Sequence, residues 1–412
     1  MTKDRMTKIE APAIHPNVAA AFAHLARTTE AVTELQIELS DIPAPTGNEG
    51  DRATAVAHWL QSTGCTVSID EVGNVIARRR GAEPGPAIAL AAHLDTVFPE
   101  GQPVRVSRPG EESPYRPGVI VPPGEFHGPG IADDAAGLAG LIAVAQAMAV
   151  SAVQTEHDVL FVATVGEEGL GDLRGARHFF ASHNLESLAA FITIDHPDPA
   201  VIVHRGVGSR RYAVEFTGPG GHAWGHFGRY NPVIALGEAM ARIGAIGSLN
   251  GPRATYNVGV ISGGRAVNAI PESARMEIDL RSEDVGQLDR LEALLREAIA
   301  SGHEVECTRS RADGAHVEIT SIGERPAGQT DPNSVLVQMA QRALQAEGLT
   351  PRLTTSSTDA NAGMAAGIPS ICLSWGGRSD NQHSVGEYFA PAGRDKSLAV
   401  LLRVVLDLAG AA

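Results

Sequence analysis

Apolar residues recur along the chain in two patterns, which predict different kinds of secondary structure. Val18, Phe22, Leu25 and Val32 have the spacing of one face of a helix, so the segment 17–40 is predicted to be helical. Other apolar residues form short continuous runs. A half-exposed strand would interrupt such a run with polar residues, so the runs predict strands that are buried on both faces. The predicted buried strands cover 86–97, 158–165, 188–195 and 369–375.

Helical segments separate these runs. The predicted helices cover 51–64, 135–151, 175–184 and 331–348. The segment 66–80 predicts a hairpin with its turn near Gly73 and Asn74. Strands that alternate with helices indicate an α/β fold, in which a mostly parallel sheet carries helices on both faces. The carboxyl ends of the strands of such a sheet are the expected place for chemistry.

The pattern changes near residue 207. The segments 209–218 and 274–283 alternate apolar and polar residues, which is typical of a sheet with one solvated or helix-covered face. The other elements predicted nearby are helices at 231–246 and 283–302 and strands at 254–264 and 316–323. We therefore expect a discontinuous catalytic domain over 1–207 and 323–412, with an α+β domain inserted over 208–322. Two domains are also the default for 412 residues.

Composition excludes several classes of function. A formal net charge of −15 argues against nucleic acid or an anionic membrane as a partner. Cys65, Cys307 and Cys372 are widely spaced without a Cys-x-x-Cys pair, so neither a disulfide framework nor a thiolate zinc site is expected. The sequence has no apolar run of membrane-spanning length, and the segment 1–16 lacks the apolar core of a signal peptide. These features predict a protein of the reducing cytoplasm.

Acidic and imidazole side chains close the predicted buried strands or the junctions between strands and helices. They are His93, Asp95, Asp133, Asp134, Glu167, Glu168, Asp195 and His383. Buried carboxylates without compensation would be very costly, and two divalent cations that share one bridging carboxylate would remove the cost. Imidazole and carboxylate ligands without thiolate suit zinc in a catalytic site, with manganese or cobalt as alternatives. One of the adjacent glutamates can then bind metal while the other moves a proton.

Each element of this constellation has a second interpretation when it is taken alone. His93 and Asp95 could form a surface pair, and Asp133 and Asp134 could cap the helix predicted after them. Glu167 and Glu168 could belong to a solvated turn. The repeated occurrence of such groups after apolar strands favours the metal site.

The same residues resemble a known family, the dinuclear zinc hydrolases of clan MH that include aminoacylase, peptidase T, glutamate carboxypeptidase G and acetylornithine deacetylase. The matching phrases in the predicted catalytic domain are "HLDTVFPEG" (93–101), "GPGIADD" (128–134), "GEEGLGD" (166–172), "TID" (193–195), "SSTDANAGMAAGIPSI" (356–371) and "HSVGEYF" (383–389). In the inserted domain they are "GPGGHAW" (218–224), "GVISGGRAVNAIP" (259–271) and "DLRSED" (279–284). The resemblance covers nearly the whole chain from about residue 35 and implies that the insert is a lid and dimerisation domain.

The resemblance also implies a role for each matching residue. His93 and Asp195 would bind one metal ion, Glu168 and His383 the other, and Asp133 would bridge both. Asp95 would orient His93, and Glu167 would be the general base. His222 would reach the neighbouring subunit's active site and polarise the substrate carbonyl, while Asn268 and Arg281 would hold a substrate carboxylate. The peptide bond between Asp133 and Asp134 would be cis by the same analogy.

The sequence departs from the family pattern in two places. Many members have Asp-x-Lys-Gly-Gly after the bridging aspartate, whereas this chain has Asp133-Asp-Ala-Ala-Gly, and the missing lysine bears on substrate selection more than on metal binding. The loop "GGRSDNQHS" before the last ligand is unusually charged. Arg378 in this loop could meet an anionic substrate or could be a solvated loop residue.

We therefore expect a metal-dependent hydrolase that cleaves an amide or peptide C–N bond of a small substrate bearing a carboxylate. A water between two metal ions would be the nucleophile, and Glu167 would take its proton. A hydrolytic deaminase of an amino-aromatic acid is the alternative within enzymes, because both reactions replace nitrogen by oxygen at an electrophilic carbon. A non-catalytic binding protein on the same fold is the alternative outside enzymes. A homodimer or a higher homo-oligomer is the expected assembly.

Overall fold

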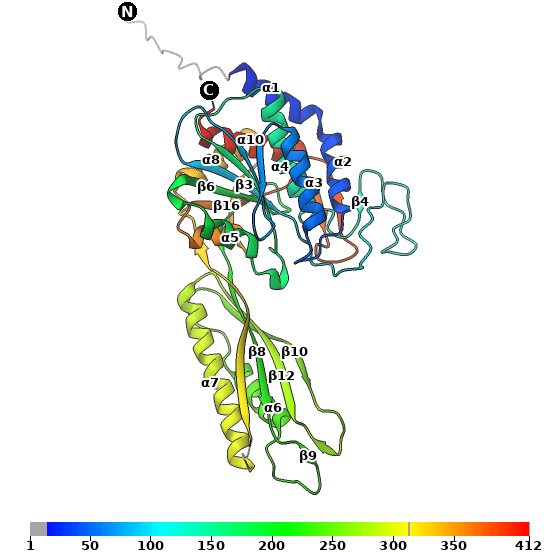
Figure 1. Cartoon of the computed structure of the whole chain (residues 1–412), viewed down its shortest axis with the longest axis vertical. Coiled ribbons are helices and arrows are strands. Elements are labelled where there is room, and N and C mark those ends of the chain that lie inside the picture. The colour runs from blue at the N-terminus through cyan, green and yellow to red at the C-terminus, as the bar shows by residue number, and fades with distance from the viewer. Residues whose placement is uncertain (1–14, 312–313, 412) are drawn as a thin grey trace, which may run out of the picture.

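In the computed structural model, residues 15–311 and 314–411 are described, and a nine-stranded sheet is the centre of the larger of two lobes (Figure 1). Its strands, in spatial order, are β1 (Thr66–Ile69), β2 (Val75–Arg79), β5 (Val159–Thr164), β3 (Ala87–His93), β6 (Leu188–Ile194), β16 (Ser370–Leu373), β7 (Val201–Gly206) and β14 (Gly328–Gln329), with β15 (Arg352–Ser356) also paired to β7. The central strands β5, β3, β6 and β16 are parallel, and antiparallel pairs flank them. The carboxyl ends of the four central strands therefore meet at one edge of the sheet.

Helices cover both faces of this sheet, as the sequence predicts. On β3, the side chains of Ile88, Leu90 and Ala92 belong to one buried cluster, whereas those of Ala87 and Ala89 belong to another. This period of two follows from the alternation of side chains along a strand. The helices of the first face are α1 (Pro16–Arg27), α2 (Thr29–Ser40), α3 (Gly50–Ser62), α4 (Ala135–Val150), α8 (Val335–Ala346) and α10 (Arg394–Ala409). Those of the second face are α5 (Arg174–Ser182) and α9 (Ala360–Ala365).

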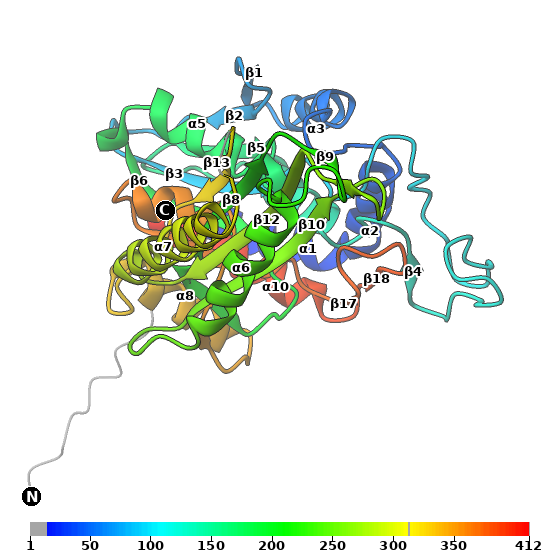
Figure 2. The same cartoon turned by 90° about the horizontal axis from the view of Figure 1, so that it is seen from below.

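A second, antiparallel sheet forms the smaller lobe. Its strand order is β10 (Ala254–Gly263), β12 (Ser273–Ser282), β8 (Gly208–Thr217) and β13 (His316–Arg325). The helices α6 (Pro232–Ala245) and α7 (Val285–Arg309) pack on one of its faces (Figure 2). Met276, Ile278 and Leu280 of β12 point into that interface and are buried, whereas Asp279 and Arg281 lie on the opposite face. The domain limits 1–207, 208–322 and 323–412 stay a prediction.

Three short strands connect two of the loops that matter for the site. They are β4 (Phe126–His127), β17 (Arg378–Asp380) and β18 (Tyr388–Ala390), in the spatial order β17, β18, β4. The loop before α4 and the loop between β17 and β18 are thereby brought side by side. A further pair, β9 (Gly221–His222) and β11 (Ala269–Ile270), lies at the end of the smaller lobe that is remote from the large sheet (Figure 1).

The prediction of a single helix over 17–40 is wrong, because the segment forms the two helices α1 and α2. The break lies at Thr28, whose φ and ψ are −106° and 13°. The Thr28 hydroxyl donates to the carbonyl of His24 at 2.9 Å, and a side-chain hydroxyl that bonds the backbone in this way competes with the continuing helix.

Among the described helices, none combines the length and the apolar character that a membrane span requires.

The helix α7 also differs from the prediction, since it continues past Gly302 to Arg309. Gly302 is buried where α7 crosses α6, and a Cβ atom there would lie 2.4 Å from the backbone nitrogen of Ala239. The glycine therefore allows a close helix–helix contact and does not end the helix.

We predict that Gly302→Ala lowers the free energy of unfolding by about 1–3 kcal/mol, because the added methyl group overpacks the contact with α6. Gly237→Ala on α6 is the matched control, since a Cβ at that exposed helical position meets no atom within 4 Å. The control should be neutral or more stable by up to about 1 kcal/mol. Denaturant unfolding of both variants measures the difference. A Gly302→Ala protein with the wild-type free energy of unfolding would show that the contact between α6 and α7 is not tightly packed at this position.

Candidate metal centre

The fold brings the five predicted metal ligands to the carboxyl edge of the large sheet. His93 ends β3, Glu168 lies four residues beyond the end of β5, and Asp195 directly follows β6. Asp133 lies in the turn before α4, and His383 lies in the loop between β17 and β18. Adjacent parallel strands and the loops beside them thus supply all five side chains.

The side chains of these residues are in contact. The Nε2 atom of His93 lies 2.9 Å from Oδ1 of Asp133 and 4.0 Å from Oδ1 of Asp195. The Nε2 atom of His383 lies 3.2 Å from Oδ2 of Asp133 and 2.8 Å from Oε1 of Glu168. One ligand atom each from His93, Asp133 and Glu168 lie within 4.8 Å of one another. Asp133 therefore stands between the two imidazoles, with one carboxylate oxygen toward each.

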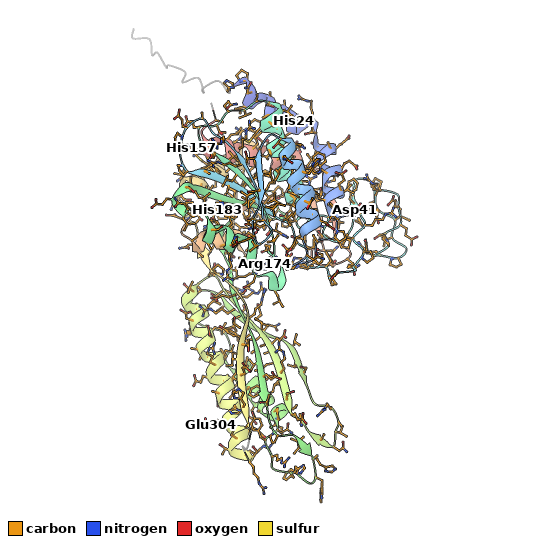
Figure 3. All side chains as sticks on the ribbon, in the orientation of Figure 1. His24, Asp41, His157, Arg174, His183 and Glu304 are labelled. Carbon is orange, nitrogen blue, oxygen red and sulfur yellow. The ribbon has the colours of Figure 1, made fainter. Side chains whose placement is uncertain are left out.

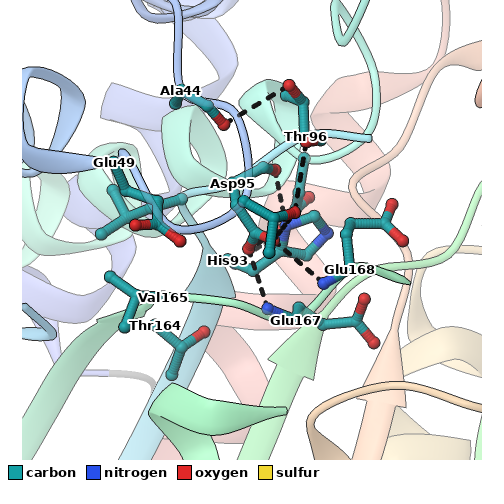
Figure 4. Close-up of polar contacts among 12 residues, drawn as sticks. Ala44, Glu49, His93, Asp95, Thr96, Thr164, Val165, Glu167 and Glu168 are labelled. Atoms are coloured by element: carbon teal, nitrogen blue, oxygen red, sulfur yellow. Dashed lines mark hydrogen bonds and ion pairs between the residues drawn. The ribbon is translucent and has the colours of Figure 1, made fainter. Parts of the chain in front are cut away.

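Asp95 fixes the turn that carries the two adjacent glutamates (Figure 4). Its fully buried carboxylate accepts the backbone N–H of Glu167 at 2.8 Å and that of Glu168 at 3.0 Å. The hydroxyl of Thr46 also donates to it, at 2.8 Å. The Nδ1 atom of His93 lies 3.6 Å from this carboxylate and 3.0 Å from the carbonyl oxygen of Asp95. Asp95 thus touches His93 mainly through its backbone, while its side chain orients the glutamates.

Two further carboxylates hold the turn around Asp133. Asp134 is the N-cap of α4, and its oxygens accept the N–H of Gly137 and the N–H of His93, each at 3.0 Å. Glu387 is fully buried, and its carboxylate accepts the N–H groups of Gly130, Ala132 and Asp133 at 2.7–3.0 Å. The peptide bond between Asp133 and Asp134 is cis, as the resemblance implies.

Burial shifts the protonation of this cluster. Burial raises the pKa of Asp195, and the neighbouring charge of Asp133 raises it further. Burial also opposes protonation of His93, but the hydrogen bond to Asp133 and the nearby carboxylate of Asp95 outweigh it and raise the His93 pKa. The carboxylates of Asp133 and Glu168 raise the pKa of His383 to about 10. Crowded carboxylates and imidazoles that favour extra protons are a donor set that fits divalent cations.

Glu167 has different partners from Glu168. Burial raises its pKa to about 8, although the charge of Arg325 acts in the opposite direction. The Nη1 atom of Arg325 donates to Oε1 of Glu167 at 3.0 Å, and its Nη2 atom donates to the Glu167 carbonyl. Arg174, the first residue of α5, lies near the junction of the two lobes (Figure 3). It donates to Glu49 at 3.2 Å and so ties the start of α5 to the loop before α3. Glu168 thus faces an imidazole, whereas Glu167 faces a guanidinium.

A cavity of about 500 Å³ opens on the cluster. Its lining includes Asp133, Glu167, Glu168, Asp195 and His383, the arginines Arg211, Arg281 and Arg325, and the hydroxyl residues Ser356, Ser357 and Thr358. Arg281 thus lines the same cavity as four of the five predicted metal ligands, and its role in holding a substrate carboxylate stays a prediction. The strand β13 supplies Arg325 and β8 supplies Arg211, so the cavity lies between the two lobes.

Besides the buried His93 and Asp95, three predicted residues do not belong to the lining of this cavity in the described part of the chain. His222 and Asn268 are exposed and close to each other, since the N–H of Ala223 donates to the Asn268 carbonyl at 2.9 Å. Both lie with β9 and β11 at the remote end of the smaller lobe (Figure 1). Arg378 is exposed on β17, which favours the interpretation of a solvated loop residue.

Sequence reasoning missed Arg211, Arg325 and Glu387. Glu387 belongs to the phrase "HSVGEYF", but nothing local distinguishes it from a surface glutamate. Arg325 ends β13 and Arg211 lies within β8, both in the other sheet, and their approach to the metal cluster depends on how the lobes meet. In the sequence each is an arginine in or beside a predicted strand, and this feature by itself does not indicate a site.

The chain is similar to known hydrolases. The model of the family described as peptidase family M20/M25/M40 matches residues 89–409. A LysW-lysine hydrolase from Deinococcus radiodurans is 26% identical over 390 residues, which are 92% of this chain and 98% of that protein.

Solved structures of low sequence identity share the fold. A tripeptidase from Staphylococcus aureus has a TM-score of 0.74 at 21% identity, covering 92% of this chain and 98% of that one. The YXEP protein from Bacillus subtilis, described as a dinuclear metal binding peptidase, has a TM-score of 0.67 at 17% identity, covering 93% and 99%. Both neighbours span nearly the whole of this chain, so the two-lobed architecture is common to all three.

We predict that the metal-free protein loses stability as the pH rises. The pKa values of Glu167 and Glu387 are about 8 in the folded state, against 4.5 for an ordinary glutamate, so the folded chain binds more protons than the unfolded chain between these values. The free energy of unfolding should fall by about 1–3 kcal/mol between about pH 5.5 and about pH 8. Unfolding in urea after chelator treatment measures this change. Added zinc should make the free energy of unfolding depend less on pH. A metal-free protein whose free energy of unfolding does not change between these pH values would contradict the prediction.

Proposed function

The chain belongs to peptidase family M20/M25/M40 and is a hydrolase of C–N bonds, and we propose that its substrate is a small amide or peptide that bears a carboxylate. The observation that carries the proposal is the contact of two imidazoles with one central carboxylate, Asp133, at the mouth of a cavity large enough for a small molecule. Arg281, in the lining of that cavity, is the proposed partner of the substrate carboxylate.

We propose that two divalent ions occupy the cluster. His93 and Asp195 would hold one ion, Glu168 and His383 would hold the other, and Asp133 would contact both. Zinc suits this donor set, with manganese or cobalt as alternatives. When bound, the ions would supply Lewis acidity that polarises a carbonyl group and lowers the pKa of water.

Glu167 is the proposed general base. It is adjacent in sequence to a proposed ligand, yet its carboxylate contacts Arg325 and lines the cavity. Its position lets it take a proton from a water molecule in the cavity and deliver that proton to the leaving nitrogen. The backbone bond to Asp95 fixes the direction from which Glu167 acts.

His222 and Asn268 are proposed to act in the site of a second subunit. Both are exposed at the end of the smaller lobe that is remote from the cavity of their own chain (Figure 1). In a homodimer, His222 would donate to the substrate carbonyl in the partner's cavity and stabilise the developing oxyanion. Asn268 would hold a substrate group beside it.

The experiment that tests the function is a screen of the zinc-loaded protein against acyl amino acids, di- and tripeptides, and amino-aromatic acids. We expect release of a free amino group from the acyl amino acids or peptides, and loss of that activity on chelation. Release of ammonia from amino-aromatic acids alone would replace amide hydrolysis with hydrolytic deamination. A zinc-loaded protein without turnover of any of these compounds would overturn the proposal.

We predict that Glu167→Gln lowers kcat on the best substrate by about 10²–10⁴-fold, because the base is lost while its shape is kept. Metal content, measured by elemental analysis, should stay that of the wild type. The matched control is Glu71→Gln, whose carboxylate is exposed beside His178. Retained turnover in Glu167→Gln would show that another group moves the proton.

We predict that His222→Ala and Glu167→Ala, each inactive alone, recover activity when they are mixed and allowed to exchange subunits. In a symmetric dimer, the heterodimer has one site with an intact Glu167 and an intact His222 from the partner. Random exchange of equal amounts should therefore restore about a quarter of the wild-type rate. Mixing without recovery, although native mass spectrometry shows heterodimers, would place His222 outside the partner's site.

A further inference from the structure

The face of the small sheet that carries no helix presents two arginines that share one carboxylate. Arg211 of β8 pairs in register with Asp279 of β12, and Arg281 lies two residues further along β12 on the same face. The Nε atom of Arg211 donates to Oδ1 of Asp279 at 3.1 Å, and the Nε atom of Arg281 donates to Oδ2 at 2.6 Å. Asp279 thus holds both guanidinium groups side by side.

Positive charge remains after these pairs are counted. Among residues 15–311 and 314–411, Arg325 is matched by Glu167, whereas Arg211 and Arg281 share the single carboxylate of Asp279. Within the described residues, Arg281 forms its hydrogen bond through Nε, and Arg211 uses Nε and Nη1, the latter to the carbonyl of Gly169. The terminal nitrogens of Arg281 and Nη2 of Arg211 keep N–H groups available, and both residues line the cavity.

This wall of the cavity lies beside the candidate metal centre. Gly169, whose carbonyl Arg211 contacts, directly follows Glu168. Gly323 lies opposite Arg211 on β13, and a Cβ atom there would come within 3.3 Å of the Arg211 side chain. The strand therefore leaves room for the long side chain of Arg211 to extend over it toward the metal cluster.

On the basis of the proposed function, we propose that Arg211 binds a second negative group of the substrate, and that the preferred substrate is an amide of an acidic amino acid. Arg281 would take the carboxylate next to the scissile nitrogen, and Arg211 would take the carboxylate of the side chain. A carboxylate matched to a guanidinium forms strong charge-assisted hydrogen bonds, and an amide in its place leaves an N–H facing an N–H.

Arg210 is a matched control for Arg211. It is the preceding residue of β8, so its side chain points to the opposite face, where it contacts Asp289 and Glu292 of α7. A change at Arg210 removes the same charge from the same strand but does not touch the cavity. Arg211 also connects the small sheet to the loop at Gly169, so a purely structural role must be separated from recognition of charge.

The experiment compares N-acetyl-glutamate with N-acetyl-glutamine, which have nearly the same shape and differ by one negative charge. The zinc-loaded wild type should show a kcat/KM that is about 10–100-fold higher for the acid. Arg211→Gln should remove most of this preference, Arg211→Lys should retain part of it, and Arg210→Gln should keep the wild-type ratio. If Arg211 has only a structural role, Arg211→Gln would lower kcat/KM equally for both substrates and leave their ratio unchanged, and this result would overturn the proposal.

A wild type without preference for the acid would also overturn it. If the wild type hydrolyses neither compound, the failure concerns the proposed function or the choice of acyl group, and binding then decides the role of Arg211. Calorimetry of the zinc-loaded protein with N-acetyl-glutamate and N-acetyl-glutamine should show tighter binding of the acid, which Arg211→Gln abolishes and Arg210→Gln preserves. Equal affinity of the wild type for the two compounds would remove Arg211 from substrate recognition.

Discussion

The carboxylates of Asp133, Glu168 and Asp195 are largely buried and surround two imidazoles at one edge of the large sheet, where the carboxylates repel one another. In a medium of low dielectric constant such repulsion is several-fold larger than in water, so the surrounding structure has to hold the charges in place. Asp95 and Glu387, both fully buried, do so by accepting five backbone N–H groups from the segments that carry Asp133 and the two glutamates. These backbone hydrogen bonds therefore hold the carboxylates close together before any ion binds.

An ion pair at this cluster of carboxylates also connects the two lobes. Arg325 comes from the last strand of the small sheet, yet its guanidinium contacts the carboxylate and the carbonyl of Glu167 in the large lobe. Asp172 adds a second connection, because its carboxylate accepts the N–H of Glu324 at 2.6 Å. The position of the small lobe and the position of the proposed base are therefore mechanically linked. A movement of the small sheet changes the environment of Glu167 directly.

The large sheet and the metal cluster could be predicted because their signals are local. A strand buried on both faces has a continuous apolar run, and the residue that follows it is at the sheet edge, so His93, Glu168 and Asp195 could be placed together from sequence. The break at Thr28 and the continuation of α7 through Gly302 could not, since they depend on a side-chain bond and on a crossing helix. Arg211 and Arg325 were missed for the related reason that their partners belong to the other lobe.

The crossing between the lobes explains how arginines of a separate sheet can line the cavity at all. The amide of Asn361, which is fully buried, donates to the carbonyls of Val207 and Pro326, each at 2.9 Å, and these residues lie in the two connections between the sheets. A Cβ atom on Gly206 would lie 2.5 Å from Oδ1 of Asn361, so a larger residue there would push the connection away. Both connections are thus tied to the start of α9, next to Thr358 of the cavity wall. Asn361 therefore acts together with the contacts of Arg325 and Asp172 to set the distance between the proposed metal ligands and the arginines that face them.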